Sequence, residues 1–277
     1  MKKAQLIHIC GDVHGEWGKL NAFINEKIRQ SKKVRALARA YDEVEAVILQ
    51  CGDFGFWPHT DPACSWCAPG EGDAKRYAIS TEVDFLKDGR VNICWCDGNH
   101  ENHDILDALE AGIPDGAFIP VMPGVFFATF GAVLTLLDGT RVMFCGGAES
   151  GPLDIQLRTP GVSWWPQEGI DDTDMARLPD PKTAHVDWII SHTGPHAFEI
   201  GGRGVVNQKN KEPSKAYLDR ILEDYSPKRW WFGHYHSRRE GWNNGCRWML
   251  LDMLGNGHGR AWADTVLLTR EEEAASD

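Results

Sequence analysis

The sequence predicts an α/β fold in which two β-sheets pack together and helices cover their outer faces. Two observations predict this fold. Up to residue 111, short apolar runs typical of buried strands alternate with segments of helical spacing. Beyond that point, strand-like runs follow one another across glycine-containing turns, of which Asp138-Gly139 is a good hairpin signal. A βαβαβα segment followed by hairpins favours two packed sheets with helices outside.

The first part of the chain alternates predicted strands and helices. Apolar runs predict strands at residues 5–10, 46–50 and 91–95. Helical spacing predicts helices at residues 17 to about 39, 79–87 and 105–111. The first of these helices carries a basic face, which we expect to be solvated.

The later part of the chain consists mostly of predicted strands. They are expected at residues 125–130, 133–137, 141–145, 188–191, 230–232, 247–252 and 265–268. One helix is predicted at residues 215–224, with Ser214 as its N-cap after Pro213. We expect a single domain over residues 1–270 and a polar tail at residues 271–277 that frays.

The charge of the chain restricts its partners. Its 277 residues include 29 lysines and arginines and 40 aspartates and glutamates, which gives a formal net charge of −11. This acidic balance disfavours nucleic acids and membrane surfaces, because both are polyanionic. The apolar stretch after Lys2 and Lys3 is too short for a signal peptide, and no run approaches the roughly 18 apolar residues of a membrane helix. We therefore expect a cytoplasmic protein with no membrane partner.

The eight cysteines fall into two groups. Most lie in or beside apolar runs and are expected to be reduced core thiols. Cys64 and Cys67 instead form a C-x-x-C in a Pro/Gly-rich stretch. A zinc knuckle needs a second pair at matching spacing, and the sequence has none, so we expect a surface loop with two thiols.

Polar residues directly follow five of the predicted strands. The five sequences are Gly11-Asp12-Val13-His14-Gly15, Gly52-Asp53-Phe54-Gly55, Asp97-Gly98-Asn99-His100-Glu101, Ser191-His192 and Gly233-His234-Tyr235-His236. In an open α/β sheet, ligands bind outside the carboxyl ends of the strands. The glycines permit tight turns that direct a polar side chain inward right after a buried strand. The five strand ends should therefore converge on one site.

The residue types in these motifs indicate a metal site. The candidate ligands are Asp12, His14, Asp53, Asn99, His192, His234 and His236. Carboxylates, an amide oxygen and several imidazoles suit borderline divalent ions, whereas Mg²⁺ or Ca²⁺ sites contain more oxygen. Mn²⁺ is our first expectation, and Fe, Zn²⁺, Co²⁺ and Ni²⁺ are the alternatives.

In its order and spacing this motif series resembles the calcineurin-like metallophosphoesterase superfamily, from Gly11 to His236. The resemblance implies a four-layer α/β/β/α sandwich of two mixed sheets flanked by helices. It implies that a first metal is held by Asp12, His14, Asp53 and His236. It implies that a second metal is held by Asp53, Asn99, His192 and His234, so that Asp53 bridges the two. His100 would be the unligated histidine near the leaving group.

Two features locate the chain within that superfamily. Gly52-Asp53 is not followed by the GDxxDRG signature of serine/threonine protein phosphatases, which puts protein dephosphorylation in doubt. The stretch 146–150, with Arg158 and residues 164–168 downstream, is similar to bacterial and phage phosphoesterases. The implied substrate is a small phosphorylated molecule or a nucleotide, as a monoester or a diester.

The resemblance also implies a mechanism. A hydroxide that bridges two metals attacks phosphorus in line, and His100 assists the leaving group. Asp97, Glu101 or Asp104 is expected to orient the His100 ring, and the sequence does not choose among the three; Asp97 is included with His100 among the catalytic candidates. Arg238 and Arg158 are candidates for binding the substrate phosphate. Trp57 follows the second motif and is expected mainly to pack.

Two other functions stay open from the sequence. A nuclease that acts on DNA or RNA would share these motifs, but the net charge of −11 argues against a long polyanionic substrate. A catalytically silent metal-binding scaffold would be expected to have lost some ligands, and here every ligand position is filled. Turnover of small phosphoesters, of single-stranded DNA or of neither distinguishes the three.

Overall fold

The computed structural model describes residues 2–29, 31–57, 91–200, 212–256 and 261–271. The predicted helix at 79–87 and the Cys64–Cys67 pair lie outside the described residues. Within them, no helix is both long and apolar enough to cross a membrane.

The first sheet has six strands in the order β12-β1-β2-β3-β5-β4. Their bounds are β1 Lys2–Cys10, β2 Glu43–Gln50, β3 Val91–Trp95, β4 Phe118–Met122, β5 Val125–Ala128 and β12 Ala263–Glu271. The four inner strands run parallel, and the edge strands β12 and β4 are antiparallel to their neighbours. The carboxyl ends of β1, β2 and β3 therefore lie side by side at one edge of the sheet.

The second sheet has six strands in the order β10-β11-β9-β8-β7-β6. Their bounds are β6 Val133–Thr135, β7 Arg141–Cys145, β8 Trp188–Ser191, β9 Arg229–Phe232, β10 Arg239–Asn243 and β11 Cys246–Leu250. Strands β7, β8, β9 and β11 are parallel, and both edge strands are again antiparallel. The two sheets are thus built alike, with a parallel centre and antiparallel edges.

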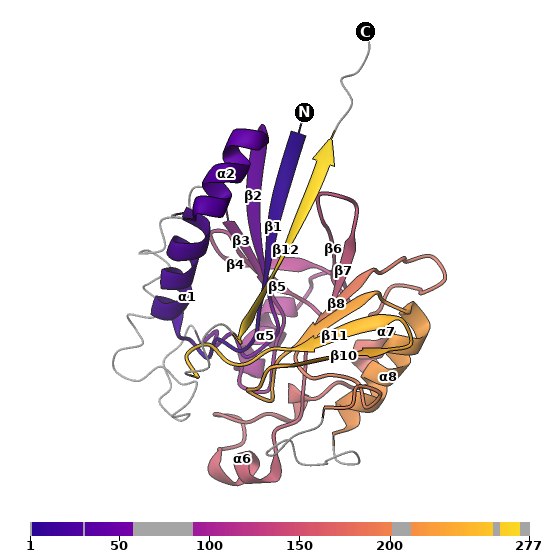
Figure 1. Ribbon diagram of the computed structural model, residues 1–277. Helices are drawn as coiled ribbons and strands as arrows, with labels where there is room; N and C mark the ends of the chain where they lie inside the picture. Colours follow the sequence, from indigo (N-terminus) through magenta and orange to yellow (C-terminus); the bar gives the residue numbers. More distant parts are fainter. Residues whose placement is uncertain (1, 30, 58–90, 201–211, 257–260, 272–277) are drawn as a thin grey trace.

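Helices lie on the outer face of each sheet (Figure 1). The first sheet is accompanied by α1 Trp17–Ile24, the π-helical turn Asn25–Arg29, α2 Lys32–Ala40 and α5 His103–Glu110. The second sheet is accompanied by α7 Asp172–Ala176 and α8 Pro213–Tyr225. Two short elements, α6 Pro152–Leu157 and the 3₁₀ turn Pro166–Glu168, follow β7. This is the expected four-layer sandwich of two mixed sheets flanked by helices.

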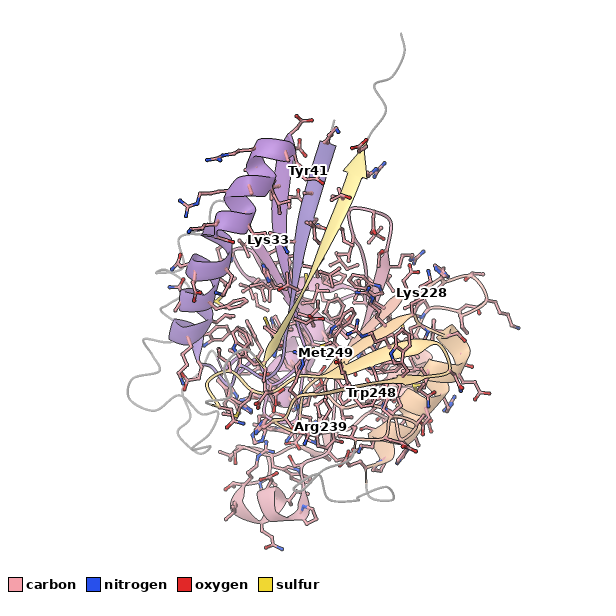
Figure 2. All side chains as sticks on the ribbon, in the orientation of Figure 1. Lys33, Tyr41, Lys228, Arg239, Trp248 and Met249 are labelled. Carbon is pink, nitrogen blue, oxygen red and sulfur yellow. The ribbon has the colours of Figure 1, made fainter. Side chains whose placement is uncertain are left out.

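Three apolar clusters hold the four layers together, and strand alternation assigns side chains to them. On β1, Leu6 faces the cluster beneath α1, whereas Ile7 faces the cluster between the sheets. On β11, Met249 lies in the cluster between the sheets, and its neighbour Trp248 lies in the cluster that includes residues of α8 (Figure 2). Because both faces of the central strands are buried, their sequences read as continuous apolar runs. Burying each large side chain stabilises the fold by about 1.5–3 kcal/mol.

Several predicted boundaries differ from the structure for identifiable reasons. The helix expected from 17 to about 39 is interrupted near Ser31, whose hydroxyl accepts a hydrogen bond from Val34 N as the N-cap of α2. The N-cap expected at Ser214 is wrong: Glu212 occupies that position, and Ser214 lies inside α8. Strand β12 extends to Glu271, which pairs with Lys2, so the strand includes the first residue of the expected tail.

One buried carboxylate joins three strands of the second sheet. Asp187 precedes β8, and its carboxylate accepts hydrogen bonds from the backbone N–H of Arg141 at 3.1 Å and from the Lys228 ammonium at 2.7 Å. His185 Nε2 lies 3.0 Å from the same carboxylate. Burial alone raises the pKa of Asp187, but these partners together lower it below its usual value.

We predict that Asp187→Ala lowers the free energy of unfolding by about 1–3 kcal/mol at pH 7, because three donors lose their acceptor. The folded-state pKa of Asp187 is lowered, so its contribution is full above the unfolded pKa of about 3.9 and is lost as the pH falls through the folded pKa. Urea unfolding at pH 7 and near pH 3 measures this difference, with Asp224→Ala on the exposed face of α8 as control. An equal loss at both pH values would contradict the prediction.

Candidate metal centre

The carboxyl ends of strands from both sheets meet at one place. Loops after β1, β2 and β3 approach those after β8 and β9, and backbone hydrogen bonds join them. His14 N donates to Asp53 O at 2.8 Å, and Gly233 N donates to His192 O at 2.9 Å. His192 Nδ1 lies 2.8 Å from Cys51 O, which links the two sheets. All seven candidate ligands lie in this region.

Four of these residues form a first cluster. One ligand atom from each of Asp12, His14, Asp53 and His236 lies within 4.8 Å of those of the others. His236 Nε2 is 3.0 Å from Asp12 Oδ2 and 3.1 Å from His14 Nε2. His14 Nε2 is 3.8 Å from Asp12 Oδ2 and 3.7 Å from Asp53 Oδ2.

A second cluster adjoins the first and shares Asp53 with it. His192 Nε2 lies 3.2 Å from Asp53 Oδ2 and 3.0 Å from Asn99 Oδ1. His234 Nδ1 lies 3.1 Å from the same Asn99 oxygen. The two clusters therefore contain the two ligand sets that the motif series implies.

The donor atoms fit a cation. Atoms that share a metal at about 2.1 Å each are roughly 3–4 Å apart. The four distances given above for the first cluster, from 3.0 to 3.8 Å, lie in this range. The imidazole nitrogens of His14 and His236 face each other at 3.1 Å between two buried carboxylates. At most one of these nitrogens can donate a hydrogen to the other, whereas a cation would take the lone pairs of both. The residues present therefore suit a divalent metal.

The backbone is unusual at the same positions. Among the described residues, six that are not glycine have a positive φ, and four of them are candidate ligands: His14 at 46°, Asp53 at 50°, His234 at 70° and His236 at 44°. Such conformations cost on the order of 1–3 kcal/mol each and tend to cluster at functional sites. Each turns its side chain sharply inward after a strand.

Two glycines leave space for the carboxylates. A Cβ atom at Gly233 would overlap the Asp12 carboxylate, and one at Gly98 would overlap that of Asp53. Neither glycine has a positive φ, so these glycines of the third and fifth motifs are needed for close approach to the carboxylates rather than for a left-handed turn.

Burial and neighbouring charges shift the pKa values of the clustered residues in opposite directions. Burial raises the pKa of Asp53, but the neighbouring histidines His192, His100 and His14 lower it well below its ordinary value. Burial lowers the pKa of His192, but Asp53 and Asp12 raise it to about 10. Asp53 thus stays ionised, and its negative charge attracts a proton on His192 as it would attract a metal ion.

His100 lies at the edge of the first cluster. Its backbone N–H donates to Asp53 Oδ1 at 2.8 Å, and its ring centroid is 5.3 Å from that of His14. Burial lowers the pKa of His100 to about 3, so the ring is neutral at pH 7. Trp57 is fully buried and donates its indole N–H to the His100 carbonyl at 3.1 Å, so it packs beneath the loop.

The three acidic candidates for orienting His100 lie in different surroundings. Asp97 lines a cavity of about 240 Å³ together with Glu110 and Asp174, and burial raises its pKa to about 7. Glu101 accepts the backbone N–H groups of Gly55 at 3.0 Å and Phe56 at 2.8 Å, which fixes the loop after β2. Asp104 is exposed in the first turn of α5. The catalytic role of Asp97 stays a prediction.

The two arginine candidates both bind backbone carbonyls. Arg238 Nη1 is 3.2 Å from the carbonyl oxygen of Ala263, at the start of β12. Arg158 Nη2 donates to the Asn99 carbonyl at 2.8 Å and lies 2.7 Å from Glu168 Oε1, with its side chain only 6% exposed. Their assignment to substrate binding stays a prediction.

Sequence reasoning missed the roles of Ser150 and Glu168. Ser150 Oγ accepts a hydrogen bond from Asn99 Nδ2 at 3.0 Å and donates one to Glu168 Oε2. A signal was present: β7 also ends in an apolar run followed by two glycines and polar residues, as the strands before the candidate ligands do. Its partner, 18 residues further along, is identified only by the tertiary structure.

Comparisons with known proteins found similarity to phosphoesterases. The calcineurin-like phosphoesterase family model matches residues 6–238. A search of curated proteins found no match. Among solved structures, a putative 5′-nucleotidase from Staphylococcus aureus has 15% identity and a TM-score of 0.45, over 95% of this chain and 50% of that one. This chain thus spans half the length of that protein.

Two further solved structures have similar scores. Phosphopantetheinyl hydrolase from Mycobacterium tuberculosis has 13% identity and a TM-score of 0.45, with 95% of each chain covered. The NAD nucleotidase of Haemophilus influenzae has 13% identity and a TM-score of 0.43, over 97% of this chain and 53% of that one. The family match carries the conclusion, because it spans most of the chain and includes every residue of both clusters. The chain belongs to the calcineurin-like phosphoesterase family.

Proposed function

We propose that the chain hydrolyses a small phosphorylated molecule or nucleotide at a centre of two divalent metal ions. The observation that carries this proposal is the carboxylate of Asp53, which belongs to both clusters. Its Oδ2 lies 3.7 Å from His14 Nε2 in one cluster and 3.2 Å from His192 Nε2 in the other. Its Oδ1 accepts the His100 N–H, which holds the carboxylate in one orientation.

The two ions would supply a hydroxide nucleophile near neutral pH and would offset the charge of the phosphoryl transition state. Asp12, His14 and His236 would hold the first ion together with Asp53. Asn99, His192 and His234 would hold the second. Mn²⁺ is proposed for both positions, because the ligand set mixes imidazoles with carboxylate and amide oxygens.

His100 is proposed to act on the leaving group. Its ring is neutral at pH 7 and lies beside the first cluster, so it can donate an N–H hydrogen bond to the leaving oxygen. A bound phosphoester brings negative charge next to the ring, which favours the protonated imidazole and thus proton transfer. Such assistance contributes on the order of 10²–10⁴-fold to the rate.

A substrate panel tests the proposed function. The purified chain is stripped of metal, reloaded with Mn²⁺ and offered p-nitrophenyl phosphate, bis-p-nitrophenyl phosphate, 2′,3′-cyclic nucleotides and single-stranded DNA. We expect turnover of at least one small ester. Cleavage of DNA alone would replace the proposal with a nuclease, and no turnover with two metals bound would replace it with a silent scaffold.

We predict that Asp53→Ala loses metal from both positions, because both clusters lose a shared ligand. Elemental analysis after reconstitution with Mn²⁺ should give about two ions per wild-type chain and fewer than one per variant chain. Asp224→Asn, which changes an exposed carboxylate on α8, should match the wild type. A variant that still holds two ions would show that Asp53 does not bridge them.

We predict that His100→Ala keeps both ions and lowers kcat by about 10²–10⁴-fold on a substrate with a poor leaving group. The loss should be smaller on p-nitrophenyl esters, whose leaving group needs little assistance. His185→Ala removes an exposed imidazole far from the clusters and serves as control. Near-normal turnover on every substrate would exclude a role for His100 at the leaving group.

A further inference from the structure

The side-chain amide of Asn99 is held in one of two orientations. Its Oδ1 faces His192 and His234 in the second cluster, and its Nδ2 donates to Ser150 Oγ at 3.0 Å. The two ends of an amide are nearly equal in size, so shape alone does not select between them. Rotating the amide by half a turn would direct an NH₂ group, which cannot bind a cation, into the cluster. Something in the structure must select the correct orientation.

Ser150 supplies that selection through its hydrogen bonds. A hydroxyl has one hydrogen and two lone pairs. The hydrogen is used toward Glu168 Oε2, and one lone pair accepts from Arg158 Nη1. Toward Asn99, the hydroxyl can therefore only accept. An amide oxygen placed there would face another oxygen with no hydrogen between them, so the NH₂ end must point to Ser150 and the oxygen to the cluster.

The direction of the hydrogen bonds at Ser150 is fixed by its two charged partners, Arg158 and Glu168. A guanidinium only donates, and an ionised carboxylate only accepts. Burial raises the pKa of Glu168 to about 7 although Arg158 acts to lower it, so this direction holds above that pH, where the carboxylate is mostly ionised, and metal binding is measured at pH 8. Arg158 Nη2 lies 2.7 Å from Glu168 Oε1, which keeps the carboxylate paired. Glu168 is 2% exposed and Ser150 6% exposed, so water competes little for these groups. The Arg158–Glu168 ion pair thus sets the direction of the hydrogen bonds at Ser150, and Ser150 in turn sets the orientation of the Asn99 amide.

Arg158 also fixes the backbone of the same asparagine. Its Nη2 donates to the Asn99 carbonyl at 2.8 Å, and its Nε donates to the Ser163 carbonyl. The side chain of Arg158 comes from the end of α6, and Glu168 from the 3₁₀ turn Pro166–Glu168. The segment between β7 and β8 thus holds a ligand that follows β3 in the other sheet.

We propose that Ser150, Arg158 and Glu168 are positioning residues that orient the Asn99 amide so that its oxygen faces the second metal position. This inference rests on the proposed function, because it concerns a ligand of that centre. The segment between β7 and β8 then supports one of the two metals selectively. The first cluster contains no residue of this segment, so its affinity for metal should not depend on Ser150.

The test measures metal binding at each position separately. Titration calorimetry with Mn²⁺ and elemental analysis are applied to the wild type, Ser150→Ala and Ser150→Thr. In Ser150→Ala the Arg158–Glu168 pair is intact, but the amide loses its selecting partner. We expect one Mn²⁺ site to be unchanged and the other to bind about 10–100-fold less tightly. Ser150→Thr keeps the hydroxyl and should restore binding, and the exposed Ser226→Ala serves as control.

Each result has a defined meaning. Unchanged affinity of both sites in Ser150→Ala overturns the inference, and so does an equal loss at both sites or a failure of Ser150→Thr to restore binding. In Arg158→Lys we expect weaker binding of the second ion. A rise in KM with normal binding of both ions would instead make Arg158 a substrate contact and overturn its positioning role. A wild type that binds fewer than two ions refutes the proposed function itself, whereas a two-metal wild type with an unaffected Ser150→Ala refutes only this inference.

Discussion

The carboxylates of Asp12 and Asp53 are fully buried, and the fold around them follows from the need to balance their charge. An isolated ionised carboxylate is very unfavourable in a protein interior. Here His236 lies 3.0 Å from Asp12 Oδ2, and His192 lies 3.2 Å from Asp53 Oδ2. Backbone N–H groups also donate hydrogen bonds to these carboxylates, from His234 to Asp12 and from His100 to Asp53. The balancing groups come from the second sheet and from the neighbouring loop, so the acidic residues are tolerable only when both sheets are packed.

Metal binding is linked to the packing of the two sheets for the same reason. Each cluster takes candidate ligands from both sheets: Asp12 and His14 with His236 in one, and Asn99 with His192 and His234 in the other. A ligand that binds only the packed form stabilises it by mass action. The apolar cluster between the sheets and the polar centre at their edge thus both favour the packed form of the two sheets. Cations at this centre would join the two halves of the sandwich.

The sequence predicted the strands that carry the ligands better than the strands at the sheet edges. β3 and β7 were predicted to the residue, because both faces of a central strand are buried and its apolar run is continuous. The edge strand β10, Arg239–Asn243, was missed because it contains mostly polar residues, and β4 was missed because it contains Pro120. The ligands follow the central strands directly, so their convergence was predictable. The Ser150–Glu168 contact was not, because hydrogen-bond partners in loops depend on tertiary structure.

The left-handed backbone at four of the candidate ligands has a consequence for how this chain changes over evolutionary time. Glycine adopts such conformations without strain, so a substitution to glycine at His14, Asp53, His234 or His236 would relieve local backbone strain. Such a substitution would remove the side chain that the site needs while easing the backbone, which is a trade-off between stability and activity. Loss of the side chains at these four positions would therefore accompany loss of activity rather than loss of the fold.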